Sequence, residues 1–127
     1  MVFDHIDLRV AQVAAAQPFY DAFLKAFGFR GRKQSNGDII YYRLADRRVQ
    51  EAVALIEAVG HIANDVRLAF HAVSPQDVDR ISSIARDAGA RSFEAPAWCP
   101  EIADGYYAAF RSDALTRPSR AARTDRE

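Results

Sequence analysis

The chain has few of the features that identify a class of protein directly. Cys99 is the single cysteine among 127 residues, which excludes an intramolecular disulfide and any Cys-x-x-Cys metal or redox site. Net charge of one sign is also absent, because 17 lysines and arginines balance 17 aspartates and glutamates. We therefore expect neither a nucleic-acid partner nor a partner selected by bulk charge.

Long hydrophobic runs are missing as well. No apolar run approaches the roughly 20 residues that cross a bilayer, and the N-terminal residues lack the basic and then apolar pattern of a signal sequence. We expect a cytoplasmic protein with no membrane partner.

The composition is that of an ordinary globular domain, with 50% hydrophobic and 27% charged residues. The length fits one domain with a core of its own.

The stretch FDHIDLRV, residues 3–10, predicts a β-strand with two unlike faces. Apart from Asp4, its even positions are apolar, whereas its odd positions include His5, Asp7 and Arg9. One face of the strand therefore carries an imidazole, a carboxylate and a guanidinium in a row.

The first sixty residues predict a β-α-β-β-β order. After the first strand, apolar residues recur at helical spacing over 18–27, with Pro18 at the first helical position and Gly28 as the stop. Three strands are expected next, separated by polar turns, near residues 29–33, 38–44 and 51–59.

The pattern then restarts, which indicates an internal repeat. The stretch VRLAFHAV, residues 66–73, again alternates, and a helix with Ser74 as its N-cap is expected over 75–88. A shift of 62 residues aligns the two halves, so we expect one domain over 1–111 built from modules at 1–60 and 64–111. In each module the helix must cover the apolar face, which leaves the polar faces to line a shared concavity.

The last residues of the chain differ from the rest. Residues 112–127 contain one large apolar residue, Leu115, and no alternation. We expect a disordered or irregular tail there, and hence a second module that is incomplete at its C-terminus. An incomplete sheet leaves an open edge, which predicts a homodimer.

The sequence resembles the vicinal oxygen chelate superfamily of glyoxalases, bleomycin resistance proteins and extradiol dioxygenases. The resemblance lies in DHIDLRVAQVAAAQPFYDAFLKAFGF, VRLAFHAVSPQDVDRISSIARDAGA and DGYYAAF, which together span residues 4–110. It implies an α+β fold of paired βαβββ modules that form an open cup. It also implies, in the catalytic members, a divalent metal held by first-strand histidines and last-strand carboxylates. Lyase, dioxygenase and purely binding members share this scaffold, so the resemblance alone gives no reaction.

The implied metal ligands carry over to this chain in part. His5 stands at the first-strand ligand position, and Glu57 is a candidate carboxylate, although a register error of one residue would turn it away. Arg67 stands where the second histidine belongs, and an arginine cannot ligate a metal. The final strand offers no fourth ligand. We therefore expect no tight metal cofactor, and a weak divalent metal through His5 and Glu57 stays open.

The residues expected to bind a ligand come from both modules, and no catalytic residue is assigned. They are His5, Asp7, Glu57, Arg67 and Tyr107. Arg67 favours an anionic small molecule, although it could instead pair internally with Asp7 or Glu57. Tyr106 and Tyr107 must point to opposite sides, one into the core and one toward the cup. Three alternatives remain: an enzyme, a non-catalytic sequestering protein, and a structural or truncated remnant that neither binds nor catalyses.

Overall fold

The computed structural model describes residues 3–62, 68–112 and 119–124. The chain divides into two compact units, residues 1–62 and 63–127. Within the described ranges, no helix is long and apolar enough to cross a membrane.

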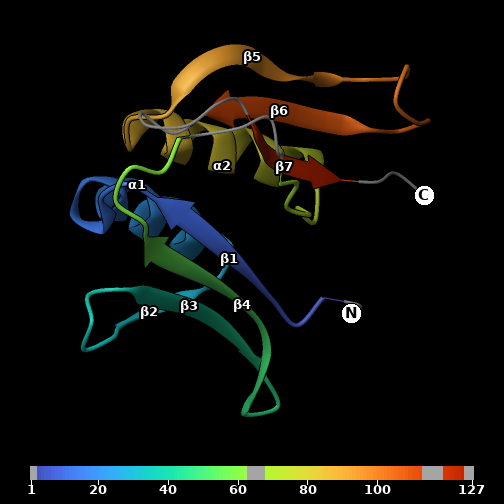
Figure 1. The fold of residues 1–127 in the computed structure, drawn as a ribbon. Coiled ribbons are helices and arrows are strands. Elements are labelled where there is room, and N and C mark those ends of the chain that lie inside the picture. The colour runs from blue at the N-terminus through green and yellow to red at the C-terminus, as the bar shows by residue number, and fades with distance from the viewer. Residues whose placement is uncertain (1–2, 63–67, 113–118, 125–127) are drawn as a thin grey trace. The chain divides into compact units, whose positions relative to one another are not determined.

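The first unit is a four-stranded sheet with one helix (Figure 1). Its elements are β1 (His5–Val10), α1 (Val13–Ala26), β2 (Arg30–Lys33), β3 (Ile39–Ala45) and β4 (Arg48–Glu57). The strand order is β1-β4-β3-β2, with β1 parallel to β4 and the other pairs antiparallel. The β-α-β-β-β order predicted from the sequence is confirmed.

Helix α1 begins earlier than the sequence predicts. Its first residue is Val13, and Pro18 lies inside the helix rather than at its start. The alanines at 14–16 are strong helix formers, which favours the added turn. The first backbone N–H, that of Val13, also finds an acceptor, because it donates to Glu57 Oε1 at 3.1 Å.

Alternation gives the first sheet two unlike faces. The face toward α1 forms the core of the unit. The strands contribute buried residues to this core, namely Val10, Ile39, Tyr41, Val53 and Leu55. The helix contributes its own buried residues, namely Val13, Ala16, Phe23 and Leu24.

Tyr41 links three elements of this core. Its ring lies against β2 at Gly31, where an added Cβ would be 3.0 Å from Tyr41 Cε1. Its hydroxyl donates to Asp21 Oδ1 on α1 at 2.6 Å. Burial of the hydroxyl and its hydrogen bond to the Asp21 carboxylate raise the pKa of Tyr41 far above its ordinary value. A side chain at position 31 would therefore crowd the Tyr41 ring on the α1 side of the sheet.

The second unit is a three-stranded sheet with one helix. Its elements are α2 (Pro75–Asp87), β5 (Arg91–Trp98), β6 (Tyr107–Ser112) and β7 (Ser119–Thr124). The strand order is β5-β6-β7, and both pairs are antiparallel. The side of α2 that packs on this sheet consists of buried residues, namely Val78, Ile81, Ser82 and Ala85. The predicted N-cap is confirmed, because the backbone N–H of Asp77 donates to Ser74 Oγ at 3.2 Å.

The second module is incomplete, as the sequence predicts, because its described sheet has three strands and the first sheet has four. Residues 119–124 were expected in an irregular tail, yet they form β7, whose backbone pairs with β6 from Tyr107 to Arg111. Backbone hydrogen bonds build this strand, and they do not require alternating apolar side chains. In the strand expected over 66–73, residues 68–70 are irregular and His71 forms only an isolated bridge. Residues 66 and 67 lie outside the described part of the chain.

Candidate functional site

Strand β1 carries most of the polar candidates, and its register with β4 fixes where they point. His5 lies beside Ala52, and Asp7 lies beside Ala54. Val10 and Leu55 are buried on the side of α1. Because side chains alternate along a strand, His5 and Asp7 point away from α1.

We call the side of the first sheet that points away from α1 the distal face. Its strand residues follow from the register, and they are His5, Asp7 and Arg9 on β1, Ala52, Ala54 and Ile56 on β4, Ile40 and Tyr42 on β3, and Arg30 and Arg32 on β2. The β3 and β4 members are half-buried, whereas the β1 and β2 members are exposed.

The register aligns these residues in two rows that cross all four strands. In each row the end residues carry a polar or charged group and the middle residues are aromatic or aliphatic: Arg30–Tyr42–Ala52–His5 and Arg32–Ile40–Ala54–Asp7. Neighbouring strands are about 4.8 Å apart, so β1 and β2 are separated by about 14 Å. The distal face therefore has charged edges and a small-residue centre on β4.

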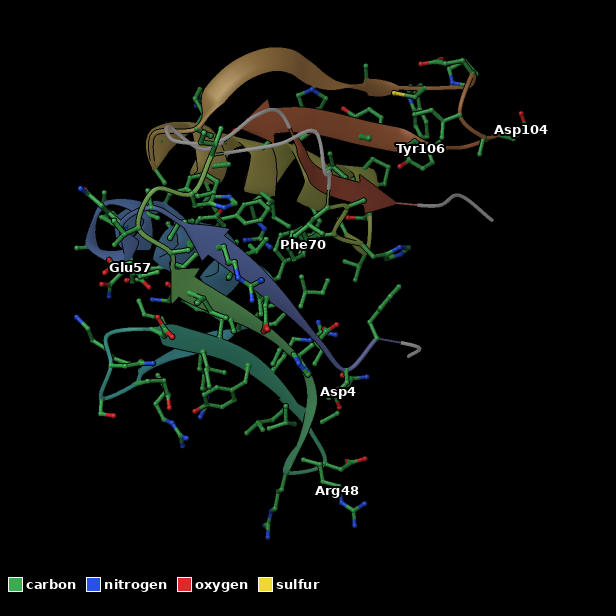
Figure 2. All side chains as sticks on the ribbon, in the orientation of Figure 1. Asp4, Arg48, Glu57, Phe70, Asp104 and Tyr106 are labelled. Atoms are coloured by element: carbon green, nitrogen blue, oxygen red, sulfur yellow. The ribbon has the colours of Figure 1, made fainter. Side chains whose placement is uncertain are left out.

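His5 is the one histidine among the described residues of this face. Its Nδ1 lies 2.9 Å from Asp4 Oδ1, just before β1, where Figure 2 labels Asp4. This hydrogen bond, followed by the charge of Asp7, raises the pKa of His5 above its ordinary value of 6.5. The exposed imidazole can therefore carry a proton near neutral pH and donate a hydrogen bond to a ligand.

The structure corrects the expectation for Glu57. Glu57 pairs with Val10 and so lies on the α1 side of the sheet, beside α1 in Figure 2. Its carboxylate accepts the N–H of Val13 at the start of α1, where a negative charge also complements the helix dipole. Ile56 takes the distal position instead. Glu57 is thus a helix cap, and it lies on the opposite face of the sheet from His5.

Tyr107 has a partner within the second unit. Its hydroxyl donates to Asp79 Oδ1 on α2 at 2.7 Å, and its ring centroid lies 4.8 Å from that of Trp98. The hydrogen bond to Asp79 raises the pKa of Tyr107. Tyr106 is buried in a cluster with Cys99. The two tyrosines have different surroundings, as expected, but the Tyr107 hydroxyl is directed at a helix.

The remaining candidate of the second unit lies beyond what the structure describes. Arg67 lies outside the described residues, so its expected role as an anion-binding residue stays a prediction. His71 is exposed next to the start of α2. The site that the structure describes is therefore the distal face of the first unit.

The described residues do not fit the metal centre that the resemblance implies. Among them, no group of three His, Cys, Asp or Glu side chains is placed to hold a metal ion. His5 and Glu57, the two expected ligands, lie on opposite faces of one sheet. A tight site requires about three or four converging ligands, and these two residues do not converge.

Sequence reasoning did not include Arg30, Arg32 and Tyr42 among the candidates. The alternation in RGRK and in IIYYRL is a signal for two faces, but it does not say which face joins His5. That assignment needed the pairing of β2 with β3 and of β3 with β4.

No family model matches the sequence, and no curated protein matches it. Several solved structures are similar. A glyoxalase/bleomycin resistance protein from Albidiferax ferrireducens has a TM-score of 0.77 and 19% identity, covering 99% of this chain and 100% of that one. A glyoxalase/bleomycin resistance protein/dioxygenase family enzyme from Burkholderia phytofirmans has a TM-score of 0.68 and 16% identity, covering 95% and 96%.

A third similar structure contains a ligand. It is a mutant of the fosfomycin resistance protein FosX from Listeria monocytogenes, complexed with Mn(II) and a dihydroxypropylphosphonic acid. Its TM-score is 0.64 at 11% identity, covering 97% of this chain and 87% of that one. At these identities the likeness shows the fold alone. The chain therefore has the α+β fold of the glyoxalase/bleomycin resistance/dioxygenase proteins, in agreement with the resemblance to the vicinal oxygen chelate superfamily.

Proposed function

We propose that this protein binds a small molecule on the distal face of its first sheet. The observation that carries the proposal is the composition of that face. A solvated sheet face usually carries polar residues at alternate positions, yet the centre of this one consists of Ala52, Ala54, Ile40 and Tyr42. Ligand sites are mostly apolar with a few well-placed polar groups, and His5 supplies one such group at the edge.

The fold supports a small-molecule ligand, because the FosX structure holds a phosphonic acid. The mode of binding differs in our proposal. Since His5 and Glu57 do not converge, the ligand is held by side chains and not through a tightly bound divalent metal. Elemental analysis of protein purified without chelator tests this point. We expect far less than one equivalent of zinc, iron, manganese or nickel, and near-stoichiometric metal would overturn it.

Ligand binding itself is tested with native mass spectrometry and thermal shifts on a metabolite panel of acids, bases and neutral compounds. Ala54→Phe places a ring over the centre of the distal face and should abolish the binding seen with the parent protein. Ala15→Phe is the matched control, because it adds the same ring to an exposed position of α1. A panel without any ligand, or equal binding by both variants, would refute the proposal.

The same face suits two kinds of function, an enzyme and a sequestering protein. An enzyme converts the bound compound, whereas a sequestering protein returns it unchanged in stoichiometric amounts. Mass spectrometry of the compound after incubation with a trace of protein separates the two functions. His5 is the one imidazole among the described distal-face residues, so His5→Gln should abolish turnover if the reaction uses an acid or base from this face.

Arg67 is part of the proposal on sequence grounds. A guanidinium at the start of the second module would add a site for an anion. Arg67→His should then reduce the thermal stabilisation by anionic compounds from the panel. If anions stabilise the variant as well as the parent, Arg67 has no role in binding.

A homodimer in the cytoplasm is also proposed. Among the strands that the structure describes, β1 has β4 as its one neighbour in the first sheet, so one side of its backbone is without a described partner strand there. A second copy of the chain could pair with such an edge. Light scattering at tens of micromolar should give twice the monomer mass, and a stable monomer would argue against the dimer. Fractionation of the native cells tests the location.

A further inference from the structure

We propose that the ligand of the distal face is an organic acid with a flat apolar body, and that Arg30 and Arg32 on β2 recognise its acid group. This inference rests on the proposed binding function and adds the chemical class of the ligand. It follows from the charge, the shape and the two unlike edges of the face.

The charge of the distal face favours an anion. Its strand residues include three guanidinium groups, those of Arg9, Arg30 and Arg32, against one carboxylate, that of Asp7, and the Asp4 carboxylate beside His5 adds a second. Within the described ranges, none of these arginines forms an ion pair. An arginine is always charged and presents a planar fork of donors that matches a carboxylate or a phosphonate. An acid group would supply the partner that the described residues do not.

The centre of the face favours a flat apolar body. Arg30 pairs with Tyr42, and Tyr42 pairs with Ala52, so the row that begins with a guanidinium continues with an aromatic ring and a methyl group. The half-buried Tyr42 ring offers a surface on which another ring can stack. The alanines of β4 are the smallest side chains of the face, which leaves room for such a ring above them.

The far edge of the face provides a second, different kind of contact. His5 can donate a hydrogen bond and Asp7 can accept one, and the two residues are neighbours on the same side of β1. They lie about 14 Å from β2. An arginine side chain that extends from β2 and an aromatic acid that is bound to it together span this distance. The acid group therefore lies toward β2, and any polar substituent at the other end of the ring lies toward β1.

The chain offers a matched control on the same strand. Lys33 pairs with Ile39, a buried residue of the α1 side, so it points away from the distal face. Gly31 confirms this alternation, because its missing Cβ would meet Tyr41 on the α1 side. Arg32 and Lys33 are adjacent, exposed and equally charged. They differ in the face of the sheet to which they belong.

The experiment is a calorimetric titration of the full chain with benzoate, phenylphosphonate and benzamide. Benzamide is the uncharged match of benzoate. We expect an acid to bind about tenfold more tightly than benzamide, since an acid gains charge-assisted hydrogen bonds. The double variant with Arg30→Ala and Arg32→Ala should lose about tenfold in affinity for the acid and keep its affinity for benzamide. Lys33→Ala should stay within about twofold of the parent. A preference for benzoate or for phenylphosphonate identifies the type of acid.

Three results would overturn the inference: no binding of either acid at tens of millimolar, equal binding of benzamide, or an equal loss in Lys33→Ala. Both arginines are exposed, so an unchanged circular dichroism spectrum and melting temperature will establish that the double variant is folded. The proposed function fails separately, because it is refuted when the broad metabolite panel yields no ligand or when Ala54→Phe and Ala15→Phe bind the ligand equally.

Discussion

The two units use their polar residues in different ways although their sequences follow one repeat. In the first unit, β1 pairs with β4 and presents His5 and Asp7 on the distal face. In the second unit, the Tyr107 hydroxyl is bound to Asp79 on the helix of the same unit. A repeat therefore preserves the plan of strands and helix, whereas the role of each side chain depends on the face that its own register assigns.

The two units also differ in how their described strands pair. The first sheet contains a parallel pair, β1 with β4, that joins the start of the unit to its end. The described part of the second sheet contains antiparallel neighbours only.

The largest expected change in the free energy of unfolding distinguishes the two faces of β4. Leu55 is 1% exposed in the core, whereas its neighbour Ile56 is half-buried on the distal face. Leu55→Ala should lower the free energy of unfolding by about 2–5 kcal/mol, and Ile56→Ala by less than half as much, because less apolar area is lost from the core. Urea denaturation measures both variants. Equal losses would contradict the assignment of faces.

The next effect tests Glu57 as a helix cap. Glu57→Ala should lower the free energy of unfolding by about 1 kcal/mol, since the first N–H of α1 loses its acceptor and the helix dipole loses a favourable charge. Glu57→Gln should lose less, because its amide oxygen still accepts. Thermal unfolding with and without added manganese provides the measurement. Metal-dependent stabilisation of the parent that disappears in Glu57→Gln would restore Glu57 as a ligand.

In the second unit, loss of the Tyr107 hydroxyl should lower the free energy of unfolding by a comparable amount and leave ligand binding unchanged. Tyr107→Phe removes the hydrogen bond to Asp79 and should cost about 1 kcal/mol of stability. The double variant Tyr107→Phe with Asp79→Asn should lose little more than the single one, because both changes remove the same bond. Affinity for the acid probe should stay within about twofold. Weaker binding without loss of stability would return Tyr107 to the ligand site.

The smallest expected effect is a pH dependence of acid binding. The Asp4 hydrogen bond and the charge of Asp7 favour the protonated His5 and raise its pKa. The positive charge is therefore present below about pH 6.5 and is lost as pH rises through the raised pKa. Affinity for terephthalate, whose second carboxylate lies toward β1, should fall by about two- to fivefold over that rise, the range of an exposed charge pair. His5→Gln should flatten the profile, and Asp4→Asn should shift its midpoint to lower pH. A flat profile for the parent would exclude His5 from the site.

Local patterns in the sequence predict a large part of this fold. The alternation over residues 3–10 predicts β1 and both of its faces, because burial on one side is a property of the strand itself. Ser74 is predicted as a helix cap because its acceptor role depends on a residue three positions away. The repeat predicts two units with one helix each.

What the sequence does not predict depends on pairing between distant segments. The face of Glu57 follows from the register of β4 against β1, and one residue of shift reverses it. The partner of Tyr107 lies 28 residues away on a helix. Strand β7 has no alternating apolar residues and is recognisable only by its pairing with β6.

The most direct test of the central claim is a measurement of nuclear Overhauser effects between ring protons of the bound acid probe and methyl groups of β4. Ala52, Ala54 and Ile56 carry methyls on the distal face, and Val53 and Leu55 carry methyls on the α1 side, along one strand. The account predicts contacts from the probe to Ala52 and Ala54 and none to Val53 and Leu55. Contacts to the α1-side methyls, or to neither set, would contradict it.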